Sequence, residues 1–180
     1  MLNLFLIILG KTISKTAQLL NLGAGSTWPG HIALKINKHF VRDVVATSNI
    51  QTILIAGTNG KTTTTKFIRT GLENHGKTVF QNEAGANLLN GIASSLIQNA
   101  KFNNVILSEA AAKSKDLIPC DYAIFEIDEN TLPHIVKEFS PDYIVLLNLF
   151  RDQLDRYGEI NTIISKWKVA LDQLPEKTTL

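Results

Sequence analysis

The chain has 180 residues, of which 44% are apolar and 19% are charged, and its formal net charge is +2. This length is sufficient for a domain with a hydrophobic core, and the small net charge does not indicate a surface for nucleic acid. The single cysteine, Cys120, excludes a disulfide within these residues and a zinc site built from four of their cysteines. The composition is that of an ordinary globular protein, in which Cys120 is expected to be a small core residue.

The first element expected along the chain is an apolar helix. The apolar run Leu4–Leu9 is far shorter than the about 20 residues that a membrane-spanning helix needs, and no signal-peptide pattern accompanies it. Apolar residues continue at near-helical spacing to Leu20. Such a helix either docks on protein or lies in a membrane interface, and docking is favoured because a single apolar helix face usually packs against protein.

A polar segment and a second helical stretch follow. The segment 21–30 contains three glycines and a proline, and Trp28-Pro29-Gly30 is predicted to form a turn. Helical spacing of apolar residues then predicts a helix over 31–47. We therefore expect an N-terminal helical segment over 1–48 and a nucleotide-binding domain over 49–180.

A strand, a glycine loop and a helix form the central motif of the chain. Ile53–Ala56 is an apolar run typical of a strand buried on both faces. Helical spacing resumes from Thr62 to Asn74, where Phe67, Ile68 and Leu72 are expected to face inward. Backbone N–H groups in such a loop bind phosphate oxygens, a lysine contacts the terminal phosphates, and a threonine hydroxyl binds Mg²⁺. The expected nucleotide-binding residues are Gly57, Thr58, Asn59, Gly60, Lys61, Thr62 and Thr63. The full pattern GxxxxGK[ST] is not met, because its first glycine would fall at Ile55.

Strands and helices alternate through the remainder of the chain. This alternation predicts an α/β fold with a mostly parallel sheet and flanking helices. The stretch 101–119 is ambiguous, and the last residues, 177–180, resemble the start of a strand. The predicted strands are 77–81, 122–127 and 143–147, and the predicted helices are 88–99, 131–139 and 160–174. The helix over 88–99 is expected to direct Leu88 inward.

Polar residues follow several of the predicted strands. Parallel strands place their carboxyl ends at one edge, where ligands bind in open α/β sheets. The segments expected to meet there are 57–62, 82–87, 126–129 and 148–155. Arg151 and Arg156 either bind phosphate or a substrate carboxylate or pair with Asp152 and Asp155.

The loop GTNGKTTT at 57–64 resembles the ATP-binding loop of the Mur ligase superfamily, whose members activate a carboxylate with ATP and join it to an amine. Four more stretches resemble those of family members that amidate lipid II with nitrogen from glutamine. These stretches are STWPGHIAL at 26–34, NEAGANLLNGI at 82–92, FEIDE at 125–129 and NLFRDQLDRYGEI at 148–160.

The resemblance implies roles for individual residues. ATP would bind with Mg²⁺, Lys61 would act in catalysis, and Thr62 and Glu126 would be the metal ligands, with Asp128 and Glu129 as the next choices. A second metal site and a carbamylated lysine, known in many Mur ligases, stay open, because Gln153 replaces a histidine and Trp167 falls at the lysine position. The weaker candidates for substrate or second-site contacts are Glu83, Asn87, Asp128, Arg151, Asp152 and Asp155.

The resemblance also implies a function and partners. The implied reaction is amidation of the D-glutamate α-carboxylate of lipid II in peptidoglycan synthesis. The implied partner is a GatD-like glutaminase subunit, and the implied location is the cytoplasm, or the inner face of the membrane. The alternatives are another amino-acid-adding enzyme, such as a folylpolyglutamate synthase, and a nucleotide-binding module without catalysis. We expect the chain to be a marginally stable N-terminal part, with the acyl-transfer residues and any zinc site beyond residue 180.

Overall fold

The structure is a computed structural model, and it describes residues 1–19, 27–82, 85–101, 117–150 and 157–180. Predictions that fall on 20–26, 83–84, 102–116 and 151–156 lie outside the described residues. The helices are α1 (Leu2–Leu19), α2 (Trp28–Ile36), α3 (Phe40–Ala46), α4 (Lys61–Asn74), α5 (Leu89–Asn99), α6 (Leu132–Glu138) and α7 (Tyr157–Leu171). The strands are β1 (Gln51–Ala56), β2 (Val79–Gln81), β3 (Tyr122–Ile127) and β4 (Tyr143–Leu146).

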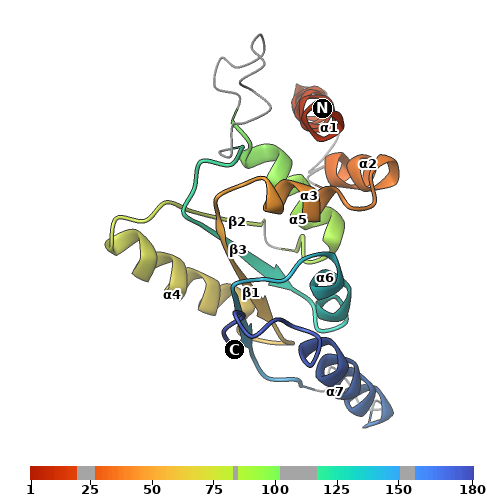
Figure 1. Cartoon of the computed structure of the whole chain (residues 1–180), viewed down its shortest axis with the longest axis vertical. Coiled ribbons are helices and arrows are strands. Elements are labelled where there is room, and N and C mark those ends of the chain that lie inside the picture. Colours follow the sequence, from red (N-terminus) through yellow and green to blue (C-terminus); the bar gives the residue numbers. More distant parts are fainter. Residues whose placement is uncertain (20–26, 83–84, 102–116, 151–156) are drawn as a thin grey trace.

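The four strands form one parallel sheet in the order β2-β3-β1-β4 (Figure 1). In the centre of the sheet, Leu54 of β1 is paired with Phe125 of β3 and with Ile144 of β4. Beyond β4, Thr179 forms a parallel bridge with Tyr143, as expected for the beginning of a further strand. The predicted α/β fold with a parallel sheet and flanking helices is confirmed.

Two aspartates align the amino ends of neighbouring strands. Asp142, just before β4, accepts hydrogen bonds through Oδ2 from the backbone N–H and the hydroxyl of Thr52 in β1, at 2.8 and 3.0 Å. Asp121, just before β3, accepts the same pair of bonds from Thr78, just before β2, at 2.8 and 2.7 Å. These bonds to Thr78 hold the pKa of the Asp121 carboxyl below its usual value. Each aspartate therefore ties the start of its own strand to the neighbouring strand.

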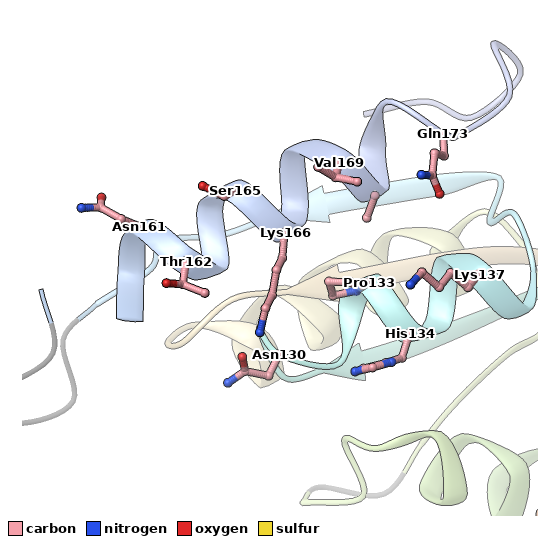
Figure 2. Close-up of a pocket in the computed structure, with 11 residues that line it drawn as sticks. Asn130, Pro133, His134, Lys137, Asn161, Thr162, Ser165, Lys166, Val169 and Gln173 are labelled. Atoms are coloured by element: carbon pink, nitrogen blue, oxygen red, sulfur yellow. The ribbon is translucent and has the colours of Figure 1, made fainter. Parts of the chain in front are cut away.

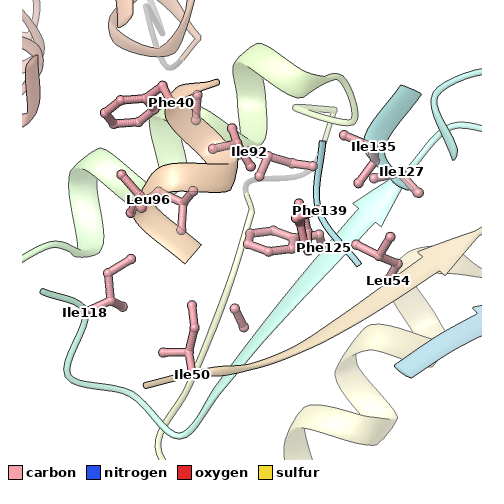
Figure 3. Close-up of a cluster of buried hydrophobic side chains, with 14 of the residues drawn as sticks. Phe40, Ile50, Leu54, Ile92, Leu96, Ile118, Phe125, Ile127, Ile135 and Phe139 are labelled. Atoms are coloured by element: carbon pink, nitrogen blue, oxygen red, sulfur yellow. The ribbon is translucent and has the colours of Figure 1, made fainter. Parts of the chain in front are cut away.

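The two faces of the sheet are covered by different helices. Side chains of a strand alternate between faces, so Ile53, Ile55 and Ile124 pack with residues of α4, while Leu54 and Phe125 belong to the larger core on the other face. That larger core also contains side chains of α1, α3, α5, α6 and α7, and Figure 3 shows Leu54 and Phe125 below Ile92 and Phe40. The sheet is thus buried on both sides, as the apolar run of β1 predicts.

The N-terminal helices dock on α5. Leu6 and Ile7 of α1 are fully buried in the larger core, so the favoured docking interpretation of this helix is confirmed. Phe5 and Ile8 on its other side are exposed. α2 and α5 approach so closely that a Cβ on Gly30 would lie 2.0 Å from the carbonyl oxygen of Asn90. None of the helices in the described ranges has the length and apolar character needed to cross a bilayer.

A small polar network fastens α1 to the two helices that follow it. The Asp43 carboxylate of α3 accepts hydrogen bonds from the side-chain amides of Asn37 and Asn3. The Asn37 bond is the largest of the contacts that lower the pKa of the Asp43 carboxyl. Because the folded pKa lies below the unfolded one, this stabilisation is complete above the ordinary carboxyl range and is lost as the pH falls through the lowered value.

Three predictions about local structure are wrong. Trp28-Pro29-Gly30 is the first turn of α2 and not a separate turn, since proline is tolerated at the start of a helix. The expected helix over 31–47 is divided into α2 and α3. Phe67 and Leu88, expected to face inward, are 81% and 54% exposed.

α6 and α7 lie side by side on the face opposite α4 (Figures 1 and 2).

We predict that Asp142→Ala lowers the free energy of unfolding by about 1–3 kcal/mol, the cost of leaving buried donors of Thr52 without an acceptor. Urea denaturation measures this change. Asp142→Asn retains an acceptor oxygen and should be milder. Asp121→Ala is the matched control, because Thr78 is exposed and water can replace the lost bonds. A larger loss for Asp121→Ala than for Asp142→Ala would contradict the argument.

Candidate nucleotide- and metal-binding site

The site begins where β1 ends and the chain turns into α4. Gly57 has φ +152° and Gly60 has φ +86°, both in the region that disfavours side chains. A Cβ on Gly57 would also lie 2.7 Å from the Cβ of Leu147, just beyond β4. The glycines therefore allow the loop to pass tightly over the end of β4 before α4 begins.

Residues after β4 hold this loop in place. The Thr58 N–H donates to the carbonyl oxygen of Asn148 at 2.9 Å, and the Phe150 N–H donates to the Thr58 hydroxyl at 3.1 Å. The Asn59 N–H lies 3.4 Å from the side-chain oxygen of Asn148. Asn148 thus supports the loop, a role that its place in the predicted polar segment 148–155 did not specify.

Lys61 brings a positive charge to the amino end of α4. Its ammonium group donates to the carbonyl oxygens of Gly57 and Thr58, at 2.6 and 2.9 Å, and lies 3.8 Å from Oδ1 of Asp128. The unpaired N–H groups at the start of α4 add a partial positive charge at the same place. The loop, the helix end and the ammonium group together suit a phosphate group.

Glu126 faces Thr62 across the gap between β3 and α4. The Thr62 hydroxyl donates to Oε2 of Glu126 at 2.8 Å. Glu126 is only 3% exposed, and its other oxygen, Oε1, is buried with no hydrogen-bond partner among the described residues. A buried carboxylate oxygen is costly without a partner, and Mg²⁺ prefers hard oxygen ligands of this kind. Thr62 and Glu126 therefore fit a magnesium ion.

A buried amide fixes the backbone of Glu126. The Asn82 side chain accepts from the Glu126 N–H and donates to the Glu126 carbonyl oxygen, both at 2.8 Å. Its amide also donates to the Ala86 carbonyl oxygen at 2.8 Å. Asn82 is fully buried and directly follows β2. Its position at a strand end was visible in the sequence, but its contact with Glu126 was not predicted.

Asp128 and Asn87 form a pair on the other side of Lys61. The Asn87 amide donates to Oδ1 of Asp128 at 3.0 Å, and Oδ1 of Asn87 is buried without a hydrogen-bond partner in the part of the chain that the structure describes. The Asp128 carboxylate lies between the Asn87 amide and the Lys61 ammonium group. The Asp128 side chain is 45% exposed, so it is much less buried than Glu126.

The position aligned with a carbamylated lysine is occupied by a core residue. The Trp167 ring is buried and its N–H donates to the carbonyl oxygen of Glu129 at 2.6 Å. Lys166 and Lys168 on either side are exposed. Over the described ranges, no group of three or more His, Cys, Asp or Glu side chains is placed to hold a metal.

The structure brings five predicted candidates to one edge of the sheet: Lys61, Thr62, Asn87, Glu126 and Asp128. Their proposed roles stay predictions. Glu83, Arg151, Asp152 and Asp155 lie outside the described residues, so the second metal site and both interpretations of the arginines are undecided.

The sequence over this fold shows which family the chain belongs to. Residues 55–180 match the Mur ligase middle domain, and the chain belongs to this family. In structure the chain is similar to the MurF ligase of Thermotoga maritima in complex with ADP, with a TM-score of 0.58, 20% identity, and coverage of 82% of this chain and 32% of that one. This likeness concerns the fold alone.

Sequence comparison points to particular relatives within the family. The chain is 33% identical over 159 residues to the MurT subunit of lipid II isoglutaminyl synthase (glutamine-hydrolyzing) from Streptococcus pneumoniae, covering 88% of this chain and 32% of that protein. It is 34% identical over 141 residues to the MurT subunit from Staphylococcus aureus strain COL, covering 78% and 28%. The chain thus spans about a third of the length of these relatives.

We predict that Lys61→Ala removes most of the affinity for Mg-ATP, because the ammonium charge next to the phosphates is lost. Calorimetry on the folded variants measures this. Lys66→Ala is the matched control, since Lys66 lies on the same helix and is exposed. Equal affinities for wild type and Lys61→Ala would contradict the assignment of the loop.

Glu126→Gln should weaken Mg²⁺-dependent nucleotide binding by about 1–3 kcal/mol, the value of a charged interaction. The glutamine can still accept the Thr62 hydrogen bond, so the fold should persist. A magnesium titration of nucleotide binding distinguishes the metal role, and Asp128→Asn should have the smaller effect. If Asp128→Asn is more damaging in this titration, Asp128 is the metal ligand.

Asn82→Ala should reproduce part of the Glu126→Gln defect, because the Glu126 backbone loses both of its bonds to the amide. The expected result is a raised magnesium requirement for nucleotide binding in protein that is still folded at low temperature. Asn99→Ala is the control, since it removes a single helix contact to the Ser95 carbonyl oxygen far from the site. An unchanged magnesium requirement in Asn82→Ala would show that the amide only stabilises the fold.

Proposed function

We propose that this protein acts as the ATP-dependent synthetase subunit of an enzyme that amidates the D-glutamate α-carboxylate of lipid II to D-isoglutamine in peptidoglycan synthesis. The observation that carries the ATP-dependent part is the contact of Thr62 with Glu126, whose other carboxylate oxygen is buried without a partner among the described residues. The choice of lipid II rests on the similarity to the MurT subunits over most of this chain.

In the proposed reaction, a carboxylate oxygen of D-glutamate attacks the γ-phosphorus of ATP and ADP leaves. Ammonia then attacks the acyl carbon of the resulting acyl phosphate, phosphate leaves, and the amide nitrogen loses a proton to solvent. Bound Mg²⁺, held by Thr62 and Glu126, would supply neutralising charge at the phosphates. Lys61 contributes the charge of its ammonium group, and the loop amides orient the phosphates, as in phosphoryl transfer generally.

Ammonia would come from a glutaminase subunit of the GatD kind, because the similar MurT proteins are subunits of a glutamine-hydrolyzing enzyme. The location that suits a lipid-linked acceptor and ATP is the cytoplasm, at the inner face of the membrane. We expect residues for the acyl-transfer step outside the chain described here, since it spans about a third of the length of those relatives. The division into a helical segment 1–48 and an ATP-binding domain 49–180 is part of the same proposal.

The test is an amidation assay on the full-length protein with its glutaminase partner. Lipid II, ATP and glutamine labelled with ¹⁵N at the amide are supplied, and mass spectrometry follows transfer of the label into the stem peptide. Lys61→Ala should abolish transfer, whereas Lys66→Ala should leave it intact. Addition of an amino acid to an acidic acceptor, with no amidation, would instead support a folylpolyglutamate synthase or another Mur-type ligase. Nucleotide binding with no turnover of any acceptor would support a non-catalytic module.

A further inference from the structure

A groove between α6 and α7 lies outside the contacts described for the nucleotide site. It has a volume of about 620 Å³ and is lined by residues of both helices, by Asn130 just before α6 and by Gln173 just after α7. Figure 2 shows Lys137 and His134 on α6 and Lys166 on α7, with the Lys166 ammonium group directed toward Asn130. The bond from Trp167 to the Glu129 carbonyl oxygen ties α7 to the start of α6, so the groove has a fixed wall. This volume is within the range of small-molecule sites.

The lining of the groove is positively charged. Lys137, Lys166 and His134 line it, and no aspartate or glutamate is among its described lining residues. Neither lysine forms an ion pair or hydrogen bond within the described ranges. The neighbouring Glu138 is instead paired with His39, just before α3, at 3.3 Å. The two lysines give the groove a positive potential that favours an anionic ligand.

Uncharged donors complete the lining. Asn130, Asn161, Ser165 and Gln173 offer amide and hydroxyl groups, while Pro133, Val169 and Ala170 provide apolar surface. A ligand with an anionic group, hydrogen-bond acceptors and an apolar part fits this mixture better than a simple ion does.

One end of the groove's lining, Asn130, is close in sequence to the nucleotide site. Asn130 is two residues beyond Asp128, whose Oδ1 lies 3.8 Å from the Lys61 ammonium group. A ligand in the groove can therefore extend to the edge of the sheet where the phosphates of a nucleotide would lie.

We propose that the groove between α6 and α7 binds a phosphate or carboxylate group of the acceptor substrate, through Lys137 and Lys166. The binding of an oxyanion here is independent of the reaction, whereas its assignment to the acceptor rests on the proposed function. The acceptor's reacting carboxylate would lie at the nucleotide site, and a second anionic group of the same molecule would lie in the groove.

Calorimetry on the full-length protein tests the oxyanion site. Saturating Mg-ADP first fills the nucleotide loop, and inorganic pyrophosphate and glutarate are then titrated separately to distinguish phosphate from carboxylate recognition. Lys137→Ala and Lys166→Ala should each weaken binding about tenfold, as expected for a charged hydrogen bond. Lys168→Ala is the matched control, because Lys168 is exposed on α7 and does not line the groove. Absence of binding by both probes, or equal effects of all three substitutions, would overturn the proposal.

Amidation kinetics test the assignment to the acceptor. Lys166→Ala should raise the KM for the acceptor while leaving the KM for ATP unchanged, and Lys168→Ala should change neither. An unchanged acceptor KM in Lys166→Ala would overturn the assignment. If the wild-type protein binds pyrophosphate or glutarate in the groove but amidates no acceptor, the oxyanion site stands and the proposed function fails.

Discussion

The structure depends on the burial of one carboxylate. Glu126 lies in the middle strand pair of the sheet with 3% of its surface exposed, where an unpaired charge would be strongly unfavourable. The Thr62 hydroxyl satisfies one of its oxygens, and Asn82 satisfies its backbone N–H and carbonyl group. The remaining oxygen has no partner in the described part of the chain, and this is the feature that most directly indicates a cation.

The topology of the sheet explains why so many polar groups meet beside this carboxylate. All four strands are parallel, and β1 is paired with both β3 and β4. The turns that follow these strands must therefore lie at one edge, as in open α/β sheets generally. The glycine loop after β1 takes its support from Asn148 after β4, and the Lys61 ammonium group approaches Asp128 after β3. The groove between α6 and α7 begins at the same edge, because both helices start there.

Much of the fold could be predicted from local patterns, and the predictions that failed have a common cause. The strand over Tyr122–Ile127 has the predicted bounds, and the other described elements agree within a few residues, apart from the division of the second helical stretch. Phe67 was expected inside because it has helical spacing with Ile68 and Leu72, yet only the latter two pack against the sheet. Periodicity shows that a helix has an apolar side, but the position of neighbouring elements decides how wide the buried part of that side is.

The sequence by itself determined the alternation of strands and helices, the glycine loop and the family resemblance, because these depend on residues close together in the chain. Only the tertiary structure decided which polar groups share the site. Thr62 and Glu126 are 64 residues apart, and Asn82 and Glu126 are 44 apart. Their contacts follow from the strand order β2-β3-β1-β4 and its register, which no local pattern specifies. The same holds for Trp167, whose burial depends on where α7 packs against the residues before α6.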